Sequence, residues 1–133
     1  MAKSFFSIFF FITVFSSLIS CAVSPDEMEV LDSSIRSYER AIRWGEFTRA
    51  KSFHKSSPVL SDLERRRLNF YRVTGYSVLQ QDIPNKHNAY LLVEIKYVKK
   101  DMQVIKTITS KQHWKRDTDS KIWYLDSAFP QFR

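Results

Sequence analysis

The chain opens with an apolar run from Phe5 to Ile19 that is interrupted only by small hydroxyl side chains and preceded by one cation, Lys3. A short positive start before such a run is typical of a secretory signal peptide. As a helix the run would rise about 22 Å, which is short of the ~30 Å hydrocarbon core of a bilayer. The pattern favours a signal peptide over residues 1–20, with a permanent transmembrane anchor as the alternative.

A helical period of apolar positions begins after residue 23. Ser24 can cap a helix, Pro25 suits its first position, and Glu27 completes an S-x-x-E capping box. The apolar residues that follow are spaced by three and four and form one stripe: Met28, Leu31, Ile35, Tyr38 and Ile42. A helix is therefore predicted as far as Trp44, with Gly45 as its left-handed end.

Two shorter helices are predicted next. One begins at Glu46-Phe47 and is broken by residues 54–58, and the other begins with a second capping box at Ser61 and spans about residues 62–70. The second carries Arg65-Arg66-Arg67, whose side chains point about 100° apart on a helix. A solvated face is the expected role of this run, and anion binding is the alternative.

From Tyr71 the apolar positions change to a period of two, which predicts strands. Residues 73–79 form the first strand, with Gly75 as a bulge, and Ile83-Pro84-Asn85-Lys86 form a turn. Residues 89–98 form the clearest strand, with Leu91, Val93, Ile95 and Tyr97 on one face. Long strand 103–116, turn 117–120 and returning strand 121–127 follow, and Phe129, Pro130 and Phe132 fold back as a tail.

The apolar run ends in Leu18-Ile19-Ser20-Cys21, which resembles the bacterial lipobox. The resemblance implies that the Cys21 thiol receives a diacylglycerol, that the bond before it is cut, and that the new amino group is acylated. Cys21 is the only cysteine, so an intramolecular disulfide is excluded. Ala22 follows where Asp would suggest inner-membrane retention, so the outer membrane, on its periplasmic face, is expected. An ordinary signal peptide with an incidental cysteine is the alternative.

Composition fits one domain over residues 21–133. Six of the eleven Phe fall in residues 1–20, but the remainder keeps five Phe, six Tyr and three Trp, enough for a core at this size. The formal net charge is +7, and Lys3 is the only charge in residues 1–20. An exported basic protein meets no standing nucleic acid, so anionic envelope material is the expected target. A surface merely solvated by scattered Lys and Arg is the alternative.

The segments Tyr38–Phe47 and Lys121–Leu125 look like the small uncharacterised bacterial lipoproteins of the NTF2-like, cystatin-like superfamily. The similarity covers about residues 24–130. It implies an α+β fold: three N-terminal helices packed on a curved antiparallel sheet of about four strands, forming a cone. It also implies that homodimers through the sheet are common, and it implies no single activity.

Enzymes of that superfamily place an Asp or His base, often with a Tyr, deep in the cone. The candidates here are Tyr38, Asp82, Glu94, His113, Tyr124 and Asp126, and none forms an acid–base pair by spacing. Tyr38, Trp44, Trp114 and Tyr124 are candidates for lining a pocket, with a core role as the alternative for the tryptophans. His54, His87 and His113 are too far apart in sequence to suggest zinc, so neither metal nor cofactor is expected.

The sequence thus predicts a lipid-anchored periplasmic interaction module without catalytic activity. It would bind another envelope protein or cell-wall polymer through the outer face of the sheet, where Leu92 lies beside Lys96 and Ile108 beside Lys106. A small-ligand carrier or enzyme is the main alternative, and it requires an open cavity in the cone with converging polar groups. A plain spacer lipoprotein is the third.

Overall fold

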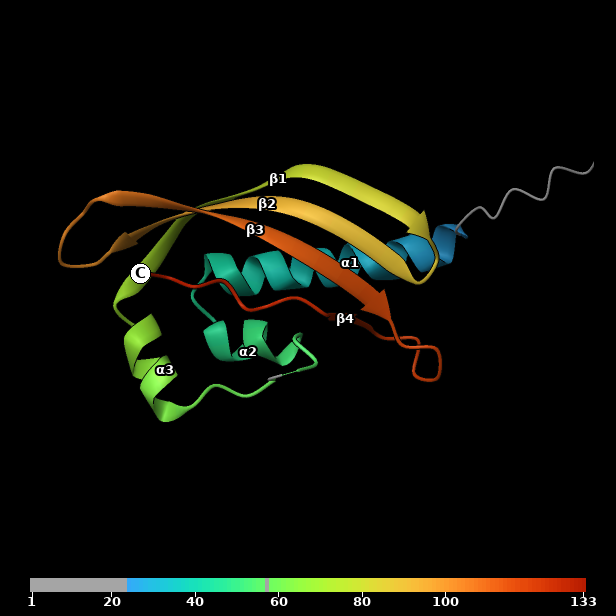
Figure 1. The fold of residues 1–133 in the computed structure, drawn as a ribbon, viewed down its shortest axis with the longest axis horizontal. Helices are drawn as coiled ribbons and strands as arrows, with labels where there is room; N and C mark the ends of the chain where they lie inside the picture. The colour runs from blue at the N-terminus through green and yellow to red at the C-terminus, as the bar shows by residue number, and fades with distance from the viewer. Residues whose placement is uncertain (1–23, 57) are drawn as a thin grey trace, which may run out of the picture.

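The computed structural model describes residues 24–56 and 58–133 (Figure 1). Helices α1 (Pro25–Arg43), α2 (Phe47–Ser52) and α3 (Asp62–Leu68) precede strands β1 (Tyr71–Asn85), β2 (Asn88–Lys99), β3 (Ile105–Arg116) and β4 (Trp123–Leu125). The strands form one antiparallel sheet in the order β1-β2-β3-β4. The fold is therefore α+β, with three helices and a four-stranded open sheet, and the sheet arches over α1.

The long helix α1 begins and ends as its sequence predicts. The Ser24 side chain accepts a hydrogen bond from the Glu27 amide at 3.4 Å, and the Glu27 carboxylate accepts one from the Ser24 amide at 3.5 Å. Trp44 caps the C-terminus, and Gly45 follows with φ 69°, a conformation that favours glycine. The buried face of α1 consists of Leu31, Ile35, Tyr38, Ala41 and Ile42.

The two short helices lie on the side of α1 away from the sheet (Figure 1). Helix α2 buries Phe47 and Ala50, while α3 buries Leu68 alone. The predicted capping box of α3 is present, since the Ser61 hydroxyl accepts from the Glu64 amide at 3.2 Å. Of the helices that the structure describes, only α1 therefore lies directly beneath the sheet; α2 packs on α1, and α3 lies at one end of the molecule.

The sheet corrects one prediction at the end of β1. Ile83, Pro84 and Asn85 belong to this strand, whereas the sequence predicted a turn there. Strand β1 lies at the sheet edge, and Pro84 falls in an irregularity between Asp82 and Asn85, where its missing N–H interrupts no regular pairing. The turn comes at residues 86–87, where the Asn85 carboxamide oxygen accepts from the His87 amide at 2.9 Å. The bulge predicted at Gly75 is confirmed.

The face that β2 turns to the core is the predicted one: Leu91, Val93, Ile95 and Tyr97 are all buried. In an antiparallel sheet, residues that lie opposite each other on neighbouring strands point to the same face. Ile108 of β3 lies opposite the buried Ile95 of β2, so it also packs against the core. The prediction that Ile108 lies on an exposed face is therefore wrong. Strand β4 is shorter at both ends than the predicted strand 121–127, and at its start Lys121 adopts φ 59°, which is not a strand conformation.

The C-terminal tail folds back as predicted and completes the core. The Phe132 ring lies 5.3 Å from that of Phe47 in α2 and 5.1 Å from that of Tyr97 in β2. Phe129 is also buried and lies 6.4 Å from Phe47. The tail thus fills the space between α2 and the sheet.

Candidate functional site

The interior beneath the sheet is filled by aromatic side chains around Tyr38. Its ring meets those of Phe53, His54 and Trp114 edge-on, at centroid distances of 5.7, 5.6 and 5.7 Å. Tyr38 and Trp114 are both 0% exposed. Edge-on aromatic pairs at such distances are favourable packing contacts, so these two residues act as core.

The polar atoms of this interior satisfy one another. The Ser127 carbonyl lies 2.7 Å from His54 Nδ1, which must donate, so Nε2 accepts from the Tyr38 hydroxyl at 3.1 Å. Burial lowers the pKa of His54 and raises the pKa of Tyr38 well above its usual range. Both groups are therefore neutral at neutral pH, and their burial withholds the pair from a substrate.

A second buried chain of hydrogen bonds crosses the sheet. The Gln112 carboxamide donates to the Tyr76 hydroxyl at 2.9 Å and accepts from the Trp114 indole at 3.1 Å. Burial raises the pKa of Tyr76 to about 12. These contacts orient the core and leave none of the three side chains free for chemistry.

On the outer face, the structure brings Tyr90 together with two of the sequence candidates, Asp82 and His113. Asp82, Tyr90 and His113 lie opposite one another on β1, β2 and β3. The Tyr90 and His113 rings stack at 4.4 Å, and Asp126 lies 4.0 Å from His113 Nδ1. Sequence reasoning missed Tyr90, because only the strand register shows which side chains are neighbours.

The electrostatics of this outer cluster favour a fixed polar surface. Lys115 Nζ lies 2.8 Å from Asp126 and lowers the pKa of that carboxyl, while Asp126 raises the pKa of Lys115. Partial burial and then Lys115 lower the pKa of His113, whose Nε2 donates to Asn88 Oδ1 at 2.9 Å. A neutral His113 beside an ion-paired Asp126 has no free carboxylate to orient it as a base.

The remaining sequence candidates lie apart from one another. Glu94 is on the outer face, 3.5 Å from Lys96, and the Tyr124 ring lies 4.5 Å from Lys55 Nζ. Cys21 and the lipobox residues Leu18, Ile19 and Ser20 lie outside the described residues. Within residues 24–56 and 58–133, no three metal-ligating side chains cluster.

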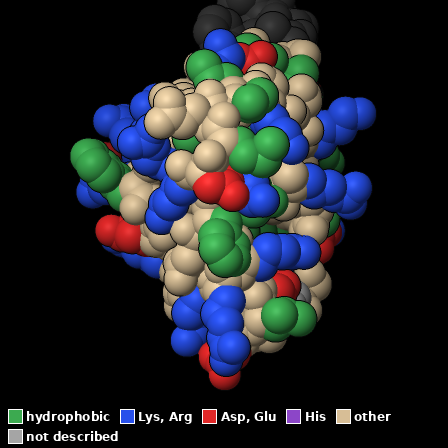
Figure 2. Space-filling view, turned by 90° about the vertical axis from the view of Figure 1, so that its left-hand side faces the viewer, with side chains coloured by type: hydrophobic (Ala, Val, Ile, Leu, Met, Phe, Trp, Pro, Cys, Tyr) green, Lys and Arg blue, Asp and Glu red, His purple; other side chains and the backbone are tan. Residues whose placement is uncertain are grey.

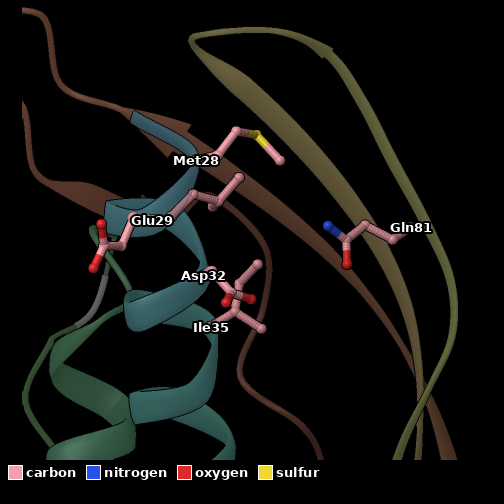
Figure 3. Close-up of a pocket in the computed structure, with 6 residues that line it drawn as sticks. Met28, Glu29, Asp32, Ile35 and Gln81 are labelled. Carbon is pink, nitrogen blue, oxygen red and sulfur yellow. The ribbon is translucent and has the colours of Figure 1, made fainter. Parts of the chain in front are cut away.

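A groove of about 270 Å³ separates α1 from β1 (Figure 3). Met28 and Gln81 point toward each other across it, and Leu31 and Ile35 contribute apolar surface from α1. Asp32 also lines the groove. It could take a small apolar group that offers a hydrogen bond to Gln81.

A larger hollow, about 370 Å³, lies at the opposite end of α1. We call it the Trp44 hollow; its lining includes Arg43, Trp44, Phe47, Leu68, Arg72 and Lys100. Trp44 is 77% exposed, because it follows Ile42 by two residues and so lies about 200° around the helix from the apolar stripe of α1. Phe47 and Leu68 are buried and supply an apolar floor.

The charges of the Trp44 hollow are all positive. Arg43 is held by Glu39 at 2.8 Å and by the Tyr76 carbonyl at 2.8 Å. Across the part of the chain that the structure describes, neither Arg72 nor Lys100 forms an ion pair. Two free cations beside an exposed indole can hold an anionic group.

The surface around the Trp44 hollow also carries exposed apolar side chains. Exposed large apolar side chains at this end belong to Leu63, Phe70, Met102, Val104 and Ile105. Figure 2, which faces this end of the molecule, shows hydrophobic side chains among Lys and Arg, with a smaller number of Asp and Glu side chains between them. Basic and apolar groups are therefore interleaved here.

Comparison with protein-family models, with curated proteins and with solved structures found no match to this chain. The class that the structure defines is an α+β domain with three helices and a four-stranded antiparallel sheet. Among the described helices, none has the length and apolar character needed to cross a bilayer.

Proposed function

We propose that the protein is a lipid-anchored interaction module on the periplasmic face of the bacterial outer membrane, with an NTF2-like cone as its folded part. The observation that carries the proposal is the contrast between inside and outside. Tyr38 and Trp114 fill the interior, whereas the Trp44 hollow presents an exposed indole beside Arg43, Arg72 and Lys100. Binding at the surface therefore fits the molecule better than chemistry inside it.

The anchor part of the proposal rests on Cys21 and the lipobox-like residues before it. Several acyl chains give stable membrane attachment, since each buried methylene contributes about 0.8 kcal/mol. Ser24, the first described residue, lies three positions after Cys21, so the linker spans at most about 11 Å. The domain would then sit close to the bilayer.

The anchor is tested by fractionating bacterial cells that produce the full chain or its Cys21→Ser variant. We expect the unchanged chain in the outer-membrane fraction and the variant displaced from it. Equal distribution of the two chains between fractions would refute the anchor.

A second candidate function, a carrier of a small apolar ligand, is favoured by the groove between α1 and β1. Its test is a Met28→Trp substitution at a half-buried position, which would fill the groove and abolish saturable binding of an apolar fluorescent probe. Binding that survives the substitution would exclude the groove as the site.

A homodimer through the outer face of the sheet is also proposed, and sedimentation equilibrium measures it directly.

A further inference from the structure

We propose that the Trp44 hollow is the docking site for an acidic peptide segment of another envelope protein, in which carboxylates flank one large apolar side chain. This inference rests on the proposed interaction function and names its surface and its partner.

Charge selects an anionic partner. Among the described residues, the hollow is lined by three cations and by no carboxylate. Arg43 already has Glu39, but Arg72 and Lys100 have no acidic partner among the described residues, as noted above. Arginine pairs with a carboxylate through two parallel hydrogen bonds, so Arg72 can both bind and orient an acidic side chain.

Shape selects a peptide over a bilayer. The hollow is a concavity of about 370 Å³ with Phe47 and Leu68 in its floor and Trp44 as a wall. A concave apolar floor accepts one side chain of a partner, whereas a bilayer surface engages side chains that protrude. Exposed Trp beside Arg is the composition found where binding energy concentrates in protein interfaces.

Position leaves the hollow accessible and able to extend. Helix α1 has 19 residues, so its two ends lie about 28 Å apart, and the hollow is at the end away from Ser24. Beside it, α3 adds a second recess, which is lined by Leu63, Glu64, Arg66, Arg67 and Phe70. The Glu64 carboxylate there is hydrogen-bonded to Ser61 and lies 3.9 Å from Lys51, so an apolar group of a bound segment can reach Leu63 and Phe70 beside two arginines.

The test is a titration of the full-length chain in non-ionic detergent with the acetylated, amidated peptide EEFEE. The control peptides are EEGEE, which lacks the apolar side chain, and KKFKK, which reverses the charge. We expect saturable changes in tryptophan fluorescence and in the backbone amide resonances of residues 43–47 and 69–73 with EEFEE. Added salt should weaken this binding, and the control peptides should bind at least tenfold more weakly.

Matched charge reversals separate the hollow from the overall charge of the protein. The double variant R72E/K100E should bind EEFEE at least tenfold more weakly, and W44A should also bind more weakly. The double variant K86E/K111E makes the same change of charge at exposed lysines on the β1–β2 turn and on β3, and should bind within twofold of the unchanged chain. Unchanged melting temperatures would show that all variants fold.

Three results would overturn the docking site: no saturable binding of EEFEE, equal weakening by the two double variants, or equal binding of EEFEE and EEGEE. The surface would instead be a lipid-binding site if the chain does not bind EEFEE but binds vesicles of phosphatidylglycerol and phosphatidylcholine, and if R72E/K100E weakens this vesicle binding. Peptide binding does not require Cys21, so failure of the membrane anchor leaves this titration unaffected and is recognised separately.

Discussion

At the scale of single residues, the pair Tyr38 and His54 shows how a functional-looking group can be structural. In the core, the Tyr38 hydroxyl donates a hydrogen bond to His54 Nε2, and His54 Nδ1 donates one to the Ser127 carbonyl. A base and a tyrosine in contact are what an acid–base site needs, yet both are enclosed. Their effect should therefore appear in stability.

The first prediction concerns the pH dependence of that stability. Burial lowers the pKa of His54 in the folded state, so below the ordinary histidine pKa the unfolded chain binds the proton more tightly. Stability should fall as the pH drops from 7.5 toward 5, and a His54→Gln variant should lose part of this dependence. Urea unfolding at several pH values measures it, with the slope of the H54Q variant compared with that of the unchanged chain. Equal slopes for H54Q and the unchanged chain would contradict the assignment.

The second prediction concerns the hydroxyl of Tyr38. A Tyr38→Phe substitution keeps the ring contacts but leaves a buried imidazole nitrogen without its donor, which costs about 1–3 kcal/mol of unfolding free energy. Denaturant unfolding measures the loss. Tyr90→Phe, at an exposed ring on the outer face, should change stability by less than about 0.5 kcal/mol.

At the scale of elements, the end of α1 depends on one backbone conformation. Gly45 has φ 69°, and a Cβ placed there would meet only Phe47 at 3.9 Å, so the cost of a side chain is conformational. Gly45→Ala should lower the unfolding free energy by about 1 kcal/mol. Gly75→Ala is the matched control, because its Cβ would make an ordinary 3.5 Å contact with Lys96. A larger loss at Gly75 than at Gly45 would contradict this explanation.

The helices and strands differ in how well the sequence alone predicts them. The helices were predicted well, because capping boxes at Ser24 and Ser61 and the stripe of α1 are local signals. The end of β1 was not, because whether a proline fits a strand depends on whether that strand lies at the sheet edge. Position in the sheet is set by pairing with distant residues, which one segment does not encode.

At the scale of the whole molecule, the surfaces that could bind a partner are assembled from distant segments. Trp44, Leu68 and Lys100 meet in one hollow, although they belong to a helix end, α3 and the β2–β3 connection. The sequence singled out Trp44, but it could not place this residue beside Leu68 and Lys100. It placed Tyr38 and Trp114 among candidates for a pocket, and packing made them core.

The fold makes a further prediction for the three tryptophans. Trp114 and Trp123 are 0% and 2% exposed, and Trp44 is 77% exposed. Acrylamide should therefore quench mainly Trp44, and a Trp44→Phe variant should lose most of the quenchable emission. Strong quenching that persists in W44F would show that the interior is open to small molecules, against the filled core described above.

The measurement that bears most directly on the account is intact mass spectrometry of the mature chain taken from bacterial membranes. The account predicts a polypeptide that begins at residue 21 and carries the added mass of a diacylglycerol and an amide-linked acyl chain on Cys21. A mature chain with an unmodified Cys21, or one that retains residues 1–20, would contradict it.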